Sequence, residues 1–198
     1  PRGDKIIIAN CSGFYGDRFS AAAEMVEGGP IHVLTGDYLA ELTMAILYKN
    51  RRKDPSLGYA VTFLKQMEGV MGACLDKGIK VVSNAGGLNP RGLAEALAQV
   101  AQRLGLSPRI AYIEGDDLLP RLAELGQAGE QFTHLDKGGP LSQSAGQPLT
   151  ANAYLGAWGV AEALANQADI VVGGRLADAA LVMGPAAWWF GWRRDDWD

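Results

Sequence analysis

The chain has 198 residues, of which 48% are hydrophobic and 20% are charged, a composition typical of a packed globular protein. Its net charge of −4 argues against nucleic acid as a partner. The longest uncharged apolar stretch, residues 179–192, contains glycines and a proline and is shorter than the roughly 18 residues that a membrane span requires, so we expect no membrane partner.

Cysteine and histidine are both scarce. The two cysteines, Cys11 and Cys74, are too few for a disulfide scaffold, and the two histidines lie far apart in the sequence. We therefore expect no metal site. The first apolar run follows directly after residues 1–4, which leaves no room for a signal peptide, so we expect a cytoplasmic protein.

Short β-branched runs alternate with stretches of helical spacing along the chain. The runs end at Asn10, Leu34, Ser83, Ile113 and Gly173. The helical stretches cover residues 19–26, 39–47, 60–74, 93–104, 118–125 and 154–164. This alternation predicts a single α/β domain over residues 1–198, with three layers: a mostly parallel sheet and helices on both of its faces, a Rossmann-like arrangement. Ligands bind at the carboxyl ends of such strands.

Regular spacing fails between residues 126 and 150, which are rich in glycine, proline and serine. A loop of this length inside a compact domain is usually functional or disordered. We predict a lid or insertion at the rim of the sheet, with a short extended piece around residues 132–135.

Four of the five tryptophans lie in the last eleven residues, at Trp188, Trp189, Trp192 and Trp197. A soluble domain rarely exposes such a patch. Either these rings pack on their own domain, or the chain is the N-terminal part of a longer protein and the rings meet the missing C-terminal segment or another subunit. The second interpretation predicts a homo-oligomer or a contact with that segment.

The turn after the first run is a candidate anion site. Small residues let backbone N–H groups approach a ligand, and a helix expected to start near Asp17 would add its positive end. The ligand-binding candidates here are Ser12, Gly13 and Gly16. The dinucleotide signature is incomplete, because Cys11 stands where its first glycine should be. Asp37 nevertheless ends the second run where a ribose-binding acid would lie, which keeps a nucleotide-dependent oxidoreductase open.

The third and fifth turns supply the remaining ligand-binding candidates, which are Asn84, Gly86, Gly87 and Arg175. The guanidinium of Arg175 can hold a carboxylate or phosphate through two parallel hydrogen bonds. Its alternative role is a salt bridge to a nearby acid. We expect the ligand to be a small anionic molecule.

Three carboxylates crowd the fourth turn, at Glu114, Asp116 and Asp117. Like charges at close range raise the pKa of at least one group, which is a route to a general acid or base at neutral pH. Asp37 and Asp178 are further acid or base candidates, although each lies near an expected helix start, where capping alone explains an aspartate.

Four segments together resemble the acyclic terpene utilization family, AtuA. They are residues 10–17 (NCSGFYGD), 35–44 (TGDYLAELTM), 82–90 (VSNAGGLNP) and 174–181 (GRLADAAL). The likeness runs in order across nearly the whole chain, and it corresponds to the N-terminal portion of the longer family members.

The resemblance implies a role in the bacterial breakdown of branched acyclic terpenols such as citronellol and geraniol, which proceeds through coenzyme A thioesters. Our first hypothesis is an enzyme that acts on a branched acyl-CoA, or a related acid, by proton-transfer chemistry of the hydratase or lyase type. The alternatives are the nucleotide-dependent oxidoreductase and a non-catalytic partner subunit of the terpene catabolic enzymes. Beyond a coenzyme A thioester as substrate, no cofactor is indicated.

Overall fold

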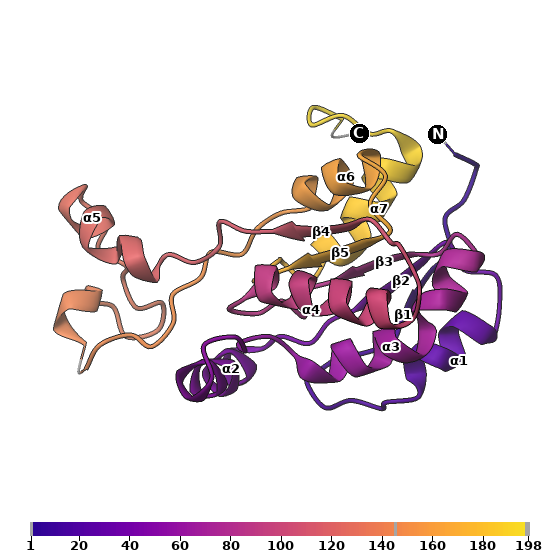
Figure 1. Cartoon of the computed structure of the whole chain (residues 1–198). Helices are drawn as coiled ribbons and strands as arrows, with labels where there is room; N and C mark the ends of the chain where they lie inside the picture. Colours follow the sequence, from indigo (N-terminus) through magenta and orange to yellow (C-terminus); the bar gives the residue numbers. More distant parts are fainter. Residues whose placement is uncertain (1, 145, 197–198) are drawn as a thin grey trace.

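The computed structural model describes residues 2–144 and 146–196, and its centre is one all-parallel β-sheet (Figure 1). In this part of the chain the strands lie in the order β1-β2-β3-β5-β4. They are β1 (Ile8–Asn10), β2 (Val33–Gly36), β3 (Lys80–Ser83), β4 (Ile110–Ile113) and β5 (Ile170–Gly173). The predicted parallel sheet is confirmed, although β1 starts three residues later than the apolar run that begins at Lys5.

Helices cover both faces of this sheet, which gives the three predicted layers (Figure 1). One face carries α1 (Ala21–Glu27), α3 (Val61–Asp76) and α4 (Pro90–Arg103), and the other carries α6 (Trp158–Ala165) and α7 (Ala180–Phe190).

Neighbouring residues of each strand belong to different hydrophobic cores. Leu34 and Val81 pack in the core under α1, α3 and α4, whereas Val33 and Val82 pack in the core under α6 and α7. Successive side chains of a strand point to opposite faces, so a central strand with helices on both sides must be apolar throughout. This requirement explains the continuous β-branched runs in the sequence.

The order of the strands creates a switch point between β3 and β5. After β3 the chain crosses over through α4 on the first face, whereas after β5 it continues into α7 on the second face. Two adjacent strands whose connections leave in opposite directions open a crevice outside their carboxyl ends, which is where ligands bind in open α/β sheets.

Helix α2 (Glu41–Lys53) lies beside the carboxyl edge of the sheet, away from the two helix layers (Figure 1). The expectation that Asp37 caps this helix is wrong, because the helix begins after Ala40. Helix α2 buries Leu47, whereas Leu42 and Ile46 are exposed.

Between β4 and α6 the chain leaves the sheet as an extended excursion, residues 118–150, which we call the arm (Figure 1). Its described residues, 118–144 and 146–150, form the short helices η1 (Leu119–Arg121), α5 (Leu122–Gln127) and η2 (Leu141–Gln143). Its irregular course agrees with the sequence pattern, but the extended piece expected around residues 132–135 forms no strand.

The helix expected to begin at Tyr154 starts only at Trp158. The reason is a bridge between Leu155 and Leu176, which draws the returning chain into an extended conformation beside the turn after β5. Tyr154 thereby lies at the rim of the sheet rather than on a helix. In the described part of the chain, no helix combines the length and the apolar character that crossing a membrane requires.

Two of the C-terminal tryptophans pack against the start of their own chain. The Arg2 guanidinium lies 4.0 Å from the centre of the Trp188 ring, and the backbone N–H of Arg2 donates to the carbonyl oxygen of Trp189 at 2.9 Å. Trp192 is 42% exposed. Trp197 lies outside the described residues. Contact of these rings with another subunit or a following segment stays a prediction.

Candidate functional site

The loops that follow the strands are joined to one another along the carboxyl edge of the sheet. The backbone N–H of Asp37 donates to the carbonyl oxygen of Ser12 at 2.9 Å, which links the loops after β1 and β2. The side chain of Asn84 donates to Asp37 Oδ1 at 2.6 Å, which adds the loop after β3. The backbone N–H of Arg175 donates to Asp116 Oδ2 at 2.8 Å, which links the loops after β5 and β4. The structure thus brings candidates from all five loops to one rim.

The first loop satisfies its own anion-binding groups. The carboxylate of Asp17 accepts hydrogen bonds from the backbone N–H groups of Gly13, at 2.9 Å, and of Arg18, at 2.6 Å. These bonds hold the pKa of Asp17 below its usual range. Helix α1 begins at Ala21, so the expectation of a helix start near Asp17 is wrong. An external anion would have to displace Asp17 from Gly13.

Two side chains lie buried beneath this loop, and Gly16 lies exposed above them. The hydroxyl of Ser12 donates to the carbonyl oxygen of Phe14 at 3.0 Å. Burial raises the pKa of the Cys11 thiol to about 11, so Cys11 is a protonated packing residue at neutral pH. Gly16 has a positive φ of 97°, a conformation that favours glycine.

Asn84 clamps the loop after β2 onto the loop after β3. Its side-chain oxygen accepts from the backbone N–H of Tyr38 at 2.8 Å, while its amide nitrogen donates to Asp37. Asn84 is completely buried. Asp37 also accepts from the backbone N–H of Leu39 at 3.3 Å, so its carboxylate serves the local fold.

The buried glycines Gly86 and Gly87 allow two different close approaches. A Cβ on Gly86 would lie 2.5 Å from the carbonyl oxygen of Gly173, so Gly86 lets the loops after β3 and β5 lie together. A Cβ on Gly87 would overlap the side chain of Leu47, so Gly87 makes room for helix α2.

The three acids of the loop after β4 differ in burial and in their hydrogen bonds. Asp116 is buried and accepts from the backbone N–H of Arg175 and, at 2.9 Å, from the side-chain nitrogen of Asn152. Glu114 and Asp117 are exposed. Asp116 therefore anchors the loop that carries Arg175, while Glu114 and Asp117 face solvent.

Arg175 is the centre of a cluster at the switch point. Its buried guanidinium donates from Nη1 to the carbonyl oxygen of Leu39 at 3.1 Å, and from Nη2 to the hydroxyl of Tyr154 at 2.7 Å. The Tyr154 hydroxyl in turn donates to Glu41 Oε1 at 2.5 Å. Carboxylate oxygens of Glu41 and Asp178 lie 3.7 and 3.8 Å from the guanidinium. Arg175 thus forms the salt bridges that the sequence left open.

This cluster joins a buried cation to an exposed carboxylate through one hydroxyl. The hydrogen bond from Tyr154 is the main cause that holds the pKa of Glu41 below its usual range, with a smaller contribution from the charge of Arg175. The side chain of Glu41 is 84% exposed. A phenol placed between a guanidinium and a carboxylate can pass a proton to or from a bound molecule.

Sequence reasoning missed Glu41 and Tyr154. They lie 113 positions apart, and only the return of the arm to the sheet brings them together. The sequence signal for Glu41 is its position in the TGDYLAELTM segment, directly after the second candidate turn.

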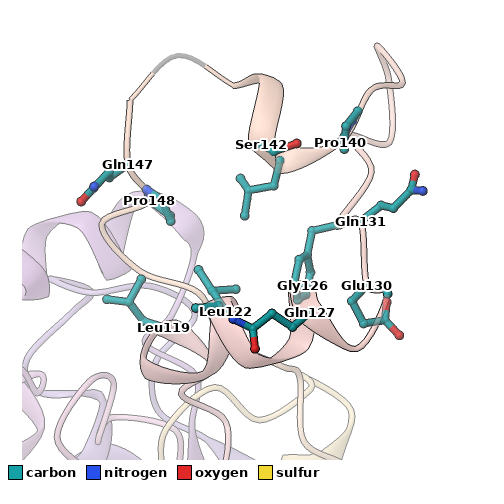
Figure 2. Close-up of a pocket in the computed structure, with 14 residues that line it drawn as sticks. Leu119, Leu122, Gly126, Gln127, Glu130, Gln131, Pro140, Ser142, Gln147 and Pro148 are labelled. Carbon is teal, nitrogen blue, oxygen red and sulfur yellow. The ribbon is translucent and has the colours of Figure 1, made fainter.

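The described part of the rim offers no metal site, and a large cavity of the chain lies elsewhere. In residues 2–144 and 146–196, no group of three His, Cys, Asp or Glu side chains is arranged to hold a metal ion. A cavity of about 950 Å³ lies within the arm rather than at the rim (Figure 2). The rim cluster and the arm cavity are therefore separate features.

Comparison with known proteins gives one match. The family model described as acyclic terpene utilisation family protein AtuA matches residues 6–198, which include every loop of the rim. No curated protein and no solved structure matches the chain.

Proposed function

Because the chain belongs to the acyclic terpene utilisation family AtuA, we propose that it acts in the breakdown of acyclic terpenoids such as citronellol and geraniol. In this proposal it binds a branched acyl-CoA, or a related acid, in the crevice between β3 and β5. The reaction is a proton transfer of the hydratase or lyase type.

The observation that carries this proposal is the Arg175–Tyr154–Glu41 cluster at the switch point. The position agrees with the general location of ligands in open α/β sheets. The positive charge of Arg175 favours an anionic ligand, and the Tyr154–Glu41 pair supplies groups that exchange protons. Among the coenzyme A thioesters of terpenoid breakdown, an enoyl thioester is a substrate that needs both a cation to bind its anionic part and groups that exchange protons.

Hydration of such a thioester assigns a role to each group. Glu41 takes a proton from water as the water oxygen bonds to the β-carbon of the double bond, and Tyr154 gives its proton to the α-carbon. The proton on Glu41 then returns to Tyr154, which restores both groups. The reverse sequence removes water.

The residues predicted from the sequence take supporting positions in this proposal. The carboxylate of Asp178 lies 3.8 Å from the Arg175 guanidinium, and exposed Glu114 is a second acid at the rim. Asp37 and Asp116 hold loops in place through internal hydrogen bonds. The remaining candidates belong to the loops after β1 and β3 at the same edge of the sheet: Ser12, Gly13, Gly16, Asn84, Gly86 and Gly87.

Calorimetric titration tests the proposal with coenzyme A thioesters of the branched acids derived from citronellol and geraniol, with the free acids, and with coenzyme A alone. We expect a thioester or acid to bind. Arg175→Lys should weaken this binding by roughly 1–3 kcal/mol, because lysine keeps the charge but cannot replace both guanidinium hydrogen bonds, to the Leu39 carbonyl and to the Tyr154 hydroxyl. The matched control is Arg103→Lys, whose wild-type side chain pairs with Glu68 at 3.0 Å on the surface. If no thioester or acid binds, or if both variants bind equally well, the proposal fails.

A non-catalytic partner subunit is the second candidate function, and the exposed arm favours it. Such a subunit would bind no thioester alone but would co-purify with a catabolic enzyme from cells grown on citronellol. The nucleotide-dependent oxidoreductase has less support, because the Asp37 carboxylate and the Gly13 N–H are both engaged within the protein.

A further inference from the structure

The arm has no core of its own. Among its described residues, and through to residue 153, none is buried. A segment this small, standing away from the sheet, buries too little apolar surface to hold one arrangement alone. Its apolar side chains therefore need a covering surface.

The arm is also concave toward an open, mostly apolar cavity (Figure 2). The apolar side chains that line this cavity are Leu119, Leu122, Phe132, Pro140, Leu141 and Pro148. Glu130 and several glutamines stand among them. A groove of this composition is suited to an amphipathic helix with an apolar ridge.

Helix α2 presents such a ridge. Leu42 and Ile46 are 74% and 37% exposed and lie one helical turn apart, whereas Leu47 of the same helix is buried. The exposure of Leu42 and Ile46 shows that the arm of the same chain does not cover them. An uncovered groove and an uncovered ridge thus belong to one molecule. The arm and α2, which carry them, both lie toward the carboxyl edge of the sheet (Figure 1).

The charges on the two surfaces are complementary. The last turn of α2 is basic, with Arg51, Arg52 and Lys53. The arm carries three acids, Glu124, Glu130 and Asp136, against the two bases Arg121 and Lys137, and Arg121 pairs with Glu124 at 2.9 Å. Opposite charges on matching surfaces favour this pairing and disfavour arm on arm or α2 on α2.

We infer that two copies of this chain form a dimer in which the arm of each copy encloses α2 of the other. Leu42 and Ile46 occupy the cavity of the partner's arm, and the basic end of α2 lies toward the arm's acids. Two-fold symmetry makes the contact reciprocal, so each dimer contains two contacts (docks) between the arm of one copy and α2 of the other. A stable interface buries about 1,200–2,000 Å² in total, so each dock must supply about half of that. With 13 residues, α2 is about 20 Å long, which gives it the reach to do so.

Cross-linking between single-cysteine additions tests which surfaces meet. Chains carrying Leu42→Cys and chains carrying Leu122→Cys are mixed, allowed to exchange, and treated with a short bismaleimide. We expect a covalent dimer from the mixture and none from either variant alone, since the natural cysteines are buried. Absence of this product from the mixture, or equal products from one variant alone, would overturn the inference.

Sedimentation velocity of the wild type and of charged variants tests whether these surfaces hold the dimer together. We expect a wild-type dimer, and at least a tenfold higher dissociation constant for Leu42→Asp and for Leu122→Asp, with unchanged far-UV circular dichroism. The matched control is Val182→Asp, an exposed apolar site on α7 that should leave the dimer intact. A monomeric wild type, or variants that dimerise as tightly as the wild type, would contradict the inference. Ligand binding at the rim is measured separately, so either proposal can fail without the other.

Discussion

Arg175 contacts Tyr154 in two ways at once: its guanidinium lies 4.1 Å from the centre of the Tyr154 ring and donates to the Tyr154 hydroxyl at 2.7 Å. Stacking fixes the ring, and the hydrogen bond orients the hydroxyl toward Glu41. The geometry of the cluster therefore depends on the loop after β5 and on the return of the arm.

Replacing Tyr154 by phenylalanine keeps the ring and removes the hydroxyl. We expect the pKa of Glu41 to rise toward its ordinary value, because the hydrogen bond from Tyr154 is the main cause of its depression. NMR titration of the Glu41 side-chain carboxyl measures this change. Tyr112→Phe is the control, since exposed Tyr112 belongs to β4 and should leave the pKa of Glu41 unchanged. An unchanged pKa in Tyr154→Phe would show that the hydroxyl does not bind Glu41 in solution.

Asp116→Ala should destabilise the fold by about 1–3 kcal/mol. The buried backbone N–H of Arg175 and the side chain of Asn152 would both lose their acceptor, and an unsatisfied buried donor costs free energy. Urea denaturation gives the change in the free energy of unfolding. Glu114→Ala, on the same loop but exposed, should change it by less than about 0.5 kcal/mol. Equal effects of the two substitutions would contradict the division of roles among these acids.

A Gly86→Ala substitution should cost roughly 1–3 kcal/mol, because the new Cβ would lie 2.5 Å from the carbonyl oxygen of Gly173 and force the switch-point loops apart. Gly126→Ala is the opposite case: the added Cβ meets nothing within 4 Å, and the site is in helix α5. It should be neutral or stabilising by up to about 1 kcal/mol. The urea midpoint distinguishes the two, and a harmless Gly86→Ala would mean that these loops are further apart in solution.

Asp169 links three strands at the amino edge of the sheet, accepting from Lys80 Nζ at 2.7 Å and from the backbone N–H of Arg109 at 2.9 Å. Burial tends to raise its pKa, but these hydrogen bonds outweigh burial and hold the pKa below its ordinary value.

A depressed pKa in the folded state gives stability that is present above the unfolded pKa and is lost as the pH falls through the folded pKa. Asp169→Asn should therefore lower the stability at neutral pH, and the difference from the wild type should shrink in acid. Thermal unfolding between neutral and acidic pH measures this. Glu95→Gln breaks an exposed pair with Arg91 and should change little at any pH. A constant difference for Asp169→Asn would contradict the assignment.

The strands could be predicted because their chemistry is local. Val33 and Leu34 pack in the cores on opposite faces of the sheet, so every position of the strand must be apolar, and the sequence shows this directly as a continuous apolar run. The order of the strands was not predicted. The apolar runs of β4 and β5 are alike, and only their pairing in space places β5 next to β3.

The sequence predicts the edge of the sheet at which the candidate residues lie, but it does not predict the hydrogen bonds among them. Asp116 and Arg175 were both candidates, yet their contact spans 59 positions and turns the acid into an anchor for the arginine loop. Tyr154 was assigned to a helix because its spacing to Trp158 and Leu164 is helical. The bridge between Leu155 and Leu176 overrides that local pattern and places the side chain of Tyr154 against Arg175.

Hydrogen–deuterium exchange with and without a branched acyl-CoA tests whether the ligand binds at the Arg175–Tyr154–Glu41 cluster, because it reports which segments of the chain the ligand protects. We expect slower exchange in the peptides that carry the switch-point loops together with Glu41 and Arg175 of the cluster, residues 36–41, 84–88 and 174–178. The arm is the matched internal reference, since its cavity of about 950 Å³ is an alternative site for an apolar chain. Protection confined to residues 118–150, with unchanged exchange at the three rim segments, would contradict the account.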